Sequence, residues 1–97
     1  MNGRTKRTAL FPLGQTVATP GALEAIEPAE ETASQLLARH QSGDWGEVPP
    51  EDAAENNLSV KQGFRILSAY TLSTETKVWV ITEADRSVTT ILLPSEY

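Results

Sequence analysis

The sequence contains no cysteine, which excludes disulfide scaffolds, thiol nucleophiles and thiolate metal sites. It has a single histidine, and aromatic residues make up only 6% of it. Structural zinc sites use four nitrogen or sulfur ligands, so this composition predicts no metal site. Gly-rich phosphate loops, a serine elbow and paired metal carboxylates at motif spacing are also absent. We therefore expect no cofactor.

Long apolar runs are missing as well, since none approaches the ~20 residues of a membrane span. The start, MNGRTKRTALFPLG, is basic but lacks the apolar stretch of a secretory signal. These absences predict a cytoplasmic protein without a membrane partner.

What is present suits one small globular domain over residues 1–97, with 39% hydrophobic and 22% charged residues. Composition divides it into three parts. Residues 1–8 form a basic arm that we expect to be flexible, residues 9–63 a helical and loop part, and residues 64–97 a β-meander.

Charge is distributed unevenly along the chain. The net charge is −5, but residues 1–7 carry three basic residues and no acidic one, whereas residues 24–55 carry nine acidic residues and one arginine. An acidic surface repels phosphates, so direct nucleic-acid binding is not expected. Such a surface suits either solubility or a basic groove on another protein.

Helix signals occur before residue 63. Thr19 followed by proline predicts an N-cap and a short helix over Gly21–Glu27. A second helix is predicted after the next proline, with Glu30 and Glu31 in its first turn. Its apolar stripe contains Ala29, Ala33, Leu36, Leu37 and His40.

A third helix is predicted after Pro49-Pro50, with Gly63 as its stop. Glu51 and Asp52 stand at its start. Its apolar stripe is thin and contains Ala54, Leu58 and Val60.

Strand signals follow over Phe64–Leu72, Lys77–Glu83 and Ser87–Leu93, and short connections predict an antiparallel meander. The fold class is therefore α+β, with N-terminal helices packed on a C-terminal three-stranded antiparallel β-meander. Whether Gln15–Thr19 adds a fourth strand stays open. A four-residue loop at Ser73–Thr76 would place Tyr70 opposite Trp79.

The predicted meander is apolar on both faces, unlike an antiparallel sheet with one wet face. The helices can cover one face. The other must meet the segment Leu10–Val17, a second copy of the chain, or a partner.

His40 is the only side chain that titrates near neutral pH without a shift. It stands four residues before Asp44, which would orient it as a general base. In the alternative of a small ribonuclease of RelE- or barnase-like architecture, it would act with Arg65 and Arg86 as phosphate clamps and Thr89 or Tyr97 as hydroxyl donors. The structural interpretation, which we favour, is a histidine partly buried at a helix C-terminus, hydrogen-bonded to a carbonyl and stabilised there when charged.

For a protein partner, the candidate contacts are charged residues of the middle region and of the last predicted hairpin, with one loop tryptophan. They are Asp44, Trp45, Glu47, Glu51, Asp52, Glu55, Asp85 and Arg86. Trp45 is equally suited to anchor its loop to the core.

Four stretches carry a resemblance: LFPLGQTVATPGALEA (10–25), LLARHQSGDWGE (36–47), RILSAYTL (65–72) and KVWVITEADRSVTTILLPSEY (77–97). Together they resemble a family of short bacterial "plasmid-related" proteins of plasmids, integrative elements and prophages. The resemblance implies a mobile-element context and brings no catalytic chemistry. The residues that it marks are His40, Asp44, Trp45, Gly46, Arg65, Thr82, Asp85, Arg86, Thr89, Thr90 and Tyr97.

Three functions are consistent with the sequence, in this order. The first is a non-enzymatic interaction module of mobile elements that modulates a host defence or nucleic-acid-processing complex in an anti-restriction or anti-CRISPR manner. The second is a structural homodimer without activity, joined through the second sheet face. The third is the ribonuclease with His40 as base.

Overall fold

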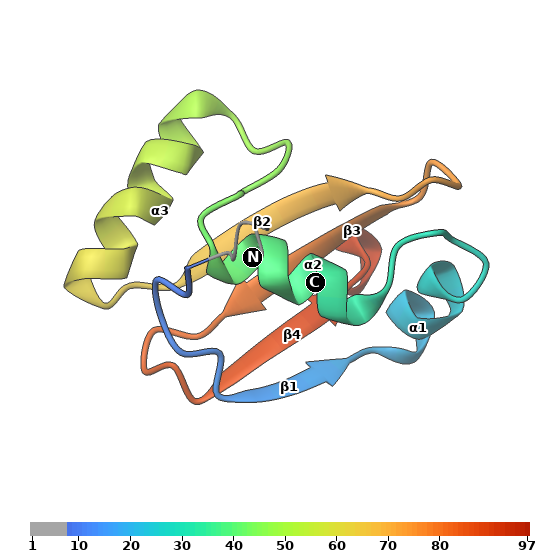
Figure 1. Ribbon diagram of the computed structural model, residues 1–97, viewed down its shortest axis with the longest axis horizontal. Helices are drawn as coiled ribbons and strands as arrows, with labels where there is room; N and C mark the ends of the chain where they lie inside the picture. The colour runs from blue at the N-terminus through green and yellow to red at the C-terminus, as the bar shows by residue number, and fades with distance from the viewer. Residues whose placement is uncertain (1–7) are drawn as a thin grey trace, which may run out of the picture.

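A four-stranded mixed sheet is the centre of the fold in the computed structural model, which describes residues 8–97 (Figure 1). Its strand order is β1-β4-β3-β2. The strands are β1 (Gln15–Ala18), β2 (Ile66–Thr71), β3 (Lys77–Thr82) and β4 (Val88–Leu92). The antiparallel meander β2-β3-β4 is confirmed. The fourth strand is present too, but it pairs with β4 in parallel, which makes the sheet mixed.

Three helices and a short C-terminal turn complete the α+β fold. They are α1 (Pro20–Ile26), α2 (Ala33–Gln41), α3 (Pro50–Gln62) and the 3₁₀ turn η1 (Pro94–Glu96). In Figure 1, α2 crosses one face of the sheet, while α1 and α3 lie toward its two ends. None of the helices within residues 8–97 is long and apolar enough to cross a bilayer. The expected basic arm falls largely on residues 1–7, outside the described part.

Two of the three helices, α1 and α3, lie within one residue of their predicted bounds. The Thr19 hydroxyl accepts a hydrogen bond from the backbone N–H of Ala22 and caps α1. At the end of α3, Gly63 adopts a left-handed conformation with a φ of 80°. A residue with a Cβ avoids this conformation, so glycine marks the helix end in the sequence.

The predicted start of α2 is wrong. Thr32 and Gln35 form a capping box, in which each side chain bonds the other residue's backbone N–H, and the helix begins after Thr32. Glu30 and Glu31 therefore precede the helix. They hold the β2–β3 loop instead, because the Glu30 N–H donates to Ser73 Oγ and a Glu31 carboxylate oxygen accepts from the Ser73 N–H.

The predicted pairing of β2 with β3 is also wrong, by one residue. The loop has three residues, since the Leu72 N–H donates to the carbonyl of Thr76, and Glu75 closes it with a φ of 72°. Tyr70 consequently faces Val78 rather than Trp79. A one-residue slip moves every side chain of a strand to the other face of the sheet. The register predicted for the second hairpin, with Thr82 opposite Thr89, is confirmed.

The main core lies between α2 and the sheet. Its buried members come from α1, α2, the three meander strands and the residue after β2: Ala22, Ile26, Leu36, Tyr70, Leu72, Val78, Val80 and Ile91. A second cluster contains Phe11, Trp45 and Ile66. Phe11 lies edge-on to the ring of His40, with 5.3 Å between ring centroids. The segment around Phe11 therefore covers the α2 side and not the second face.

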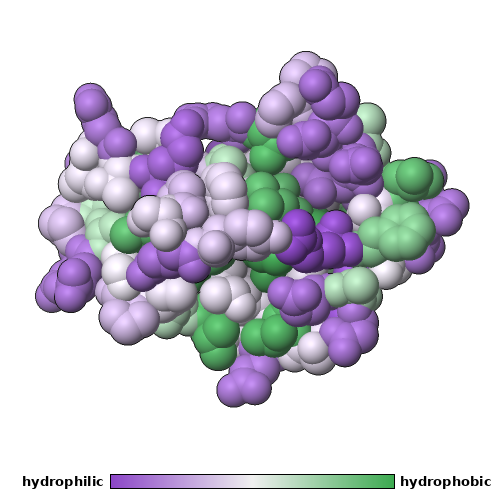
Figure 2. Space-filling view, turned by 180° about the vertical axis from the view of Figure 1, so that it is seen from behind, coloured by the Kyte–Doolittle hydropathy of each residue, from purple (hydrophilic) through white to green (hydrophobic). Residues whose placement is uncertain are grey.

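The second face is covered in part by the end of the chain. Trp79 is half-buried there and meets Tyr97 edge-on, with 5.6 Å between ring centroids. The Arg65 guanidinium lies 5.4 Å from the centre of the Tyr97 ring and donates to its hydroxyl. Figure 2 looks onto this side and shows apolar patches between polar ones. Residues after β4 thus supply cover that the predicted N-terminal segment does not.

Candidate functional site

A buried chain of polar side chains surrounds His40. Its ring is 0% exposed. Nδ1 lies 2.6 Å from Ser68 Oγ, and Nε2 lies 2.9 Å from Thr82 Oγ1. Thr82 Oγ1 is in turn 2.7 Å from Thr89 Oγ1, and the Thr89 hydroxyl donates to the carbonyl of Leu13. Five residues from α2, all three meander strands and the segment before β1 thus form one connected network.

The direction of these hydrogen bonds follows from the last member. The Thr89 hydroxyl has one proton and donates it to the Leu13 carbonyl, so in the contact between the two threonines Thr82 is the donor. Thr82 then has no proton left for the imidazole and accepts one from Nε2–H of His40. In the neutral ring Nδ1 is therefore the acceptor, and Ser68 donates to it. Every polar atom in the network has a partner when His40 is neutral.

Burial lowers the pKa of His40 from 6.5 to about 4, and the positive charge of Arg86 acts in the same direction. The charged imidazolium would lose its hydration inside the protein. A proton on Nδ1 would also prevent the Ser68 hydroxyl from donating its hydrogen bond to that atom. A structural role for His40 therefore fits the geometry, but the expected details are wrong. The ring is fully buried, its partners are hydroxyl groups rather than a carbonyl, and it is neutral rather than charged.

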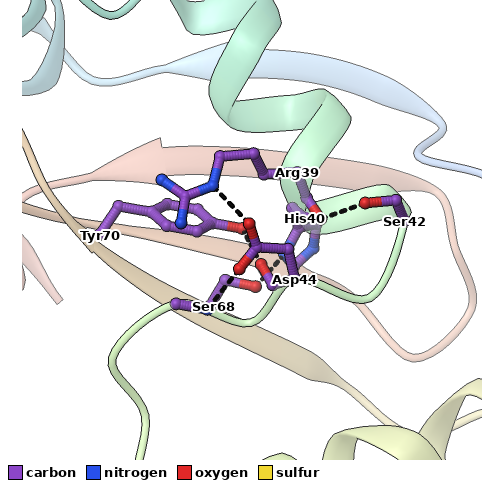
Figure 3. Close-up of polar contacts among 7 residues, drawn as sticks. Arg39, His40, Ser42, Asp44, Ser68 and Tyr70 are labelled. Carbon is purple, nitrogen blue, oxygen red and sulfur yellow. Dashed lines mark hydrogen bonds and ion pairs between the residues drawn. The ribbon is translucent and has the colours of Figure 1, made fainter. Parts of the chain in front are cut away.

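Asp44 has other partners than His40 (Figure 3). Its Oδ2 lies 2.6 Å from Nε of Arg39, in an ion pair at the surface. The Arg39 guanidinium also lies 4.4 Å from the centre of the Tyr70 ring, and the Tyr70 hydroxyl donates to the backbone carbonyl of Asp44. These contacts fasten the loop after α2 to strand β2.

Trp45 anchors the same loop to α3. It is buried, with 6% exposed, and its Nε1–H donates to Asn57 Oδ1 at 3.0 Å. Its neighbour Gly46 lies against Ala69, and backbone hydrogen bonds on either side of it join the loop to the outer edge of β2. Asn56 continues this cover, because its amide group both donates to and accepts from the backbone of Leu67. The β2 edge is thus closed to a further strand.

The residues of the ribonuclease alternative do not meet in one place. Thr89 lies in the buried network with His40, whereas Arg65 and Tyr97 pair with each other on the opposite face of the sheet. The Arg86 guanidinium lies over the Phe11 ring, 5.5 Å from its centre. Its guanidinium donates to backbone carbonyls of Ser59, Phe64, Glu83 and Ala84. Arg86 therefore joins the β3–β4 loop to the end of α3.

Four of the acidic candidates lie on α3 or in the loop before it. Glu51, Asp52 and Glu55 lie exposed on the first two turns of α3, and Glu47 is exposed in the loop before it. We call these four residues the acidic surface. Asp52 and Glu55 also border a hollow of about 190 Å³, which is further lined by Val48, Asn56, Arg65 and Leu67. Asp85 is exposed in the β3–β4 loop, where its carboxylate accepts from the Ser87 N–H.

Sequence reasoning missed several residues that shape this site. The strand pattern marks Ser68 and Thr82 only as strand residues, and their hydroxyls become significant once the register places them beside His40. The predicted stripe of α3 is wrong for Ala54 and Leu58, which are exposed, whereas Val60 packs against the second cluster. The buried residues of the helix are Asn56 and Ser59. Asn56 was the available signal, because an asparagine on the inner face of a helix needs a hydrogen-bond partner inside the protein.

No protein-family model, curated protein or solved structure matches this chain. Within residues 8–97, no three His, Asp or Glu side chains come together in a way that could hold a metal ion. The function must therefore be inferred from the chain's own residues.

Proposed function

We propose that this protein is a non-enzymatic interaction module that binds a basic region of another protein through the acidic surface. The observation that carries the proposal is the grouping of Glu51, Asp52 and Glu55, all exposed, at the first two turns of α3. Glu55 lies three residues after Asp52 and four after Glu51, so its carboxylate neighbours both of the other carboxylates on the helix surface. They repel one another there, and a cationic partner relieves this repulsion.

The helix that carries these carboxylates is held firmly in place. Asn56 bonds the backbone of Leu67, Asn57 accepts from the indole of Trp45, and Arg86 donates to the carbonyl of Ser59. Only two residues of α3, Asn56 and Ser59, are buried. Directed polar contacts thus fix the helix together with Ala53 and Val60, which pack against the second cluster. A preorganised surface loses little freedom on binding, which favours affinity.

The state of His40 supports a binding role over catalysis. Both ring nitrogens are engaged by hydroxyl groups, and the ring has no exposed surface. A general base must lie within hydrogen-bond reach of the proton that it removes. The ribonuclease alternative would require this network to open.

For the partner, we propose a nucleic-acid-processing or defence complex of the host, in keeping with the resemblance to mobile-element proteins. Proteins that hold nucleic acids present basic grooves to the phosphates. A row of carboxylates on a rigid helix is complementary to such a groove, and it does not suit direct nucleic-acid binding. The acidic surface would then act by occupying the groove.

Capture experiments test the proposal. The tagged protein, the reversal variant E51K/D52K/E55K and a control variant E24K/E27K/E30K serve as baits in host extract, with quantitative mass spectrometry at several salt concentrations. Both variants change the net charge equally, and the control carboxylates are located around α1, away from α3. We expect a partner that the wild type and the control capture and the reversal variant loses. Equal capture by all three baits would overturn the proposal.

A homodimer is a second candidate, joined through the open edge of β1 and not through the second sheet face that the sequence suggested. β1 is the outer strand beside β4, all four of its residues are uncharged, and Val17 is 41% exposed. An apolar hollow of about 120 Å³ lies along it, lined by Thr16, Val17, Ala18, Ala33, Leu37 and Ile91. An uncharged open edge can pair with its own copy.

Sedimentation equilibrium distinguishes this candidate. Pairing through β1 predicts a mass that rises with concentration in the wild type and stays that of one chain in Val17→Lys, because a lysine at the strand centre would be brought against its copy. A wild-type mass of one chain at every concentration would exclude the homodimer.

A further inference from the structure

We infer that the partner segment bound by the acidic surface is a basic amphipathic helix whose apolar side packs on Leu58 and Phe64. This inference rests on the proposed function and adds the chemical class of the partner. Leu58 is 49% exposed and Phe64 is 54% exposed. Both stand at the C-terminal end of the helix whose beginning carries Glu51, Asp52 and Glu55.

The two apolar side chains flank the end of α3. Gly63 takes the left-handed conformation and donates its N–H to the carbonyl of Ser59. With glycine at this position, the residue after it and a residue of the last helical turns commonly touch, here Phe64 and Leu58. Figure 2 shows apolar side chains together at the edge of the molecule where α3 ends and β2 begins, with polar side chains around them.

A cap contact alone does not account for this pair, because about half of each side chain is still exposed. Phe64 and Leu58 thus leave apolar area exposed at the end of the helix that carries the exposed carboxylates. The acidic rim determines the sign of the partner's charge, and the apolar pair requires an apolar group within the same segment. Together they describe one amphipathic segment.

The spacing favours a helix as that segment. Glu51, Glu55 and Leu58 stand at positions i, i+4 and i+7 and therefore share one stripe of α3. The stripe is about 10 Å long, at 1.5 Å per residue. A partner helix that lies along α3 repeats its own side chains at the same rise. It can place a lysine or arginine two turns from a leucine and satisfy both ends at once.

The two ends should contribute differently to binding. Exposed carboxylates accelerate encounter with a basic partner, and salt weakens their effect. Apolar contacts mainly slow dissociation and are insensitive to salt. The acidic residues and the apolar pair can therefore be separated by measurement.

Two synthetic 18-residue helical peptides serve as probes. One has a lysine face and a leucine face, and in the other every leucine is replaced by glutamine. We expect the full-length wild type to bind the Lys/Leu peptide at least about tenfold more tightly than the Lys/Gln peptide, as the burial of one or two apolar side chains implies. In amide NMR spectra of the wild type, the Lys/Leu peptide should shift the signals of Leu58 and Phe64 together with those of residues 51–55.

The variant L58Q/F64Q should lose that tenfold preference and keep the salt dependence of the wild type. The control L10Q/L23Q removes two leucines that are 44% and 54% exposed elsewhere, and it should bind as the wild type does. The conservative variant L58M/F64L should retain the preference. The inference would be overturned if the wild type bound the two peptides equally well. It would also be overturned if the wild-type signals shifted at residues 51–55 and not at Leu58 and Phe64. Both measurements use the wild type, so they do not depend on whether a variant folds.

Failure of this inference is distinguishable from failure of the proposed function. If the reversal variant E51K/D52K/E55K loses both peptides while L58Q/F64Q behaves as the wild type, only the apolar anchor is wrong. If the reversal variant binds both peptides as the wild type does, the acidic surface is not the docking surface and both proposals fail.

Discussion

His40 and Thr82 share a buried hydrogen bond, with 2.9 Å between the imidazole Nε2 and the threonine Oγ1. Because the Thr82 hydroxyl donates to Thr89, it accepts from the Nε2–H of His40, and this contact joins α2 to the centre of the sheet. The network makes the only histidine of the chain a structural element, and its consequences can be measured.

The first prediction concerns acid stability. Unfolded His40 takes up a proton near its ordinary pKa of 6.5, whereas folded His40 does so only near a pKa of about 4. The stability linked to this group is therefore fully present above pH 6.5 and is lost as the pH falls toward 4. Between pH 7 and pH 5 the free energy of unfolding should fall by about 2 kcal/mol.

Urea denaturation at several pH values measures this loss. His40→Gln lacks the titrating ring and should show a much flatter pH dependence in the same window, whatever its absolute stability. The carboxylates of Glu31, Asp85 and Glu96 have lowered pKa values and titrate below it. An equal slope in the wild type and His40→Gln would contradict the assignment.

The second prediction concerns the hydroxyl groups of the buried network around His40. Thr82→Val keeps the shape of the side chain but leaves the Nε2–H of His40 without an acceptor. A buried donor without a partner costs about 1–3 kcal/mol. Thr90→Val, on the opposite face of the sheet, is the matched control and should change the free energy of unfolding by no more than about 0.5 kcal/mol. Similar denaturation midpoints for the two variants would show that the Thr82 hydrogen bonds of the network are unimportant for stability.

The third prediction compares two glycines of the same backbone conformation. Gly46 and Gly63 have φ values of 76° and 80°. A Cβ on Gly46 would overlap the carbonyl oxygen of Ala69, whereas a Cβ on Gly63 would meet nothing within 4 Å. Gly63→Ala should therefore cost only the left-handed strain of about 1–2 kcal/mol, and Gly46→Ala should cost clearly more, because it displaces the loop from β2. Equal thermal stabilities of the two variants would contradict the close approach of Gly46 to β2.

The fourth prediction concerns the loop that sets the register of β2. Glu75 has a φ of 72°, a conformation that strains a residue with a Cβ. Glu75→Gly should stabilise the protein by up to about 1 kcal/mol. Asp85→Gly, in the other hairpin, is the comparison, because Asp85 does not have a positive φ. A loss of stability on Glu75→Gly would speak against the three-residue loop.

Much of the local structure could be predicted from short-range signals. Thr19, Gly63 and the β-branched strands act through their own neighbours, so their effects can be recognised in the sequence. Predictions failed where two local signals competed. The apolar stripe that begins at Ala29 favoured an early start of α2, and the Thr32–Gln35 capping box prevailed because it satisfies two backbone N–H groups at once.

The candidate site was predictable only as a set of residue types. The exposed carboxylates of α3 followed from the charge pattern, and Trp45 had two open interpretations until its indole was found against Asn57. Leu58 was expected to be buried, but it is exposed. Its exposure depends on the rotation of α3 about its axis, which the hydrogen bonds of Asn56 and Arg86 set and which the apolar periodicity of the sequence does not reveal.

By itself the sequence determined the α+β class, the order of helices and meander, and the charge of the middle region, because these depend on composition and on neighbours a few residues apart. The tertiary structure decided the parallel pairing of β1, the face to which each side chain of β2 points, and the neutral state of His40. The face of β2 depends on the conformation of the three-residue loop that joins it to β3. The other two depend on groups far apart in the chain, and their energies exist only once the fold has brought those groups within hydrogen-bond distance and removed water from around them.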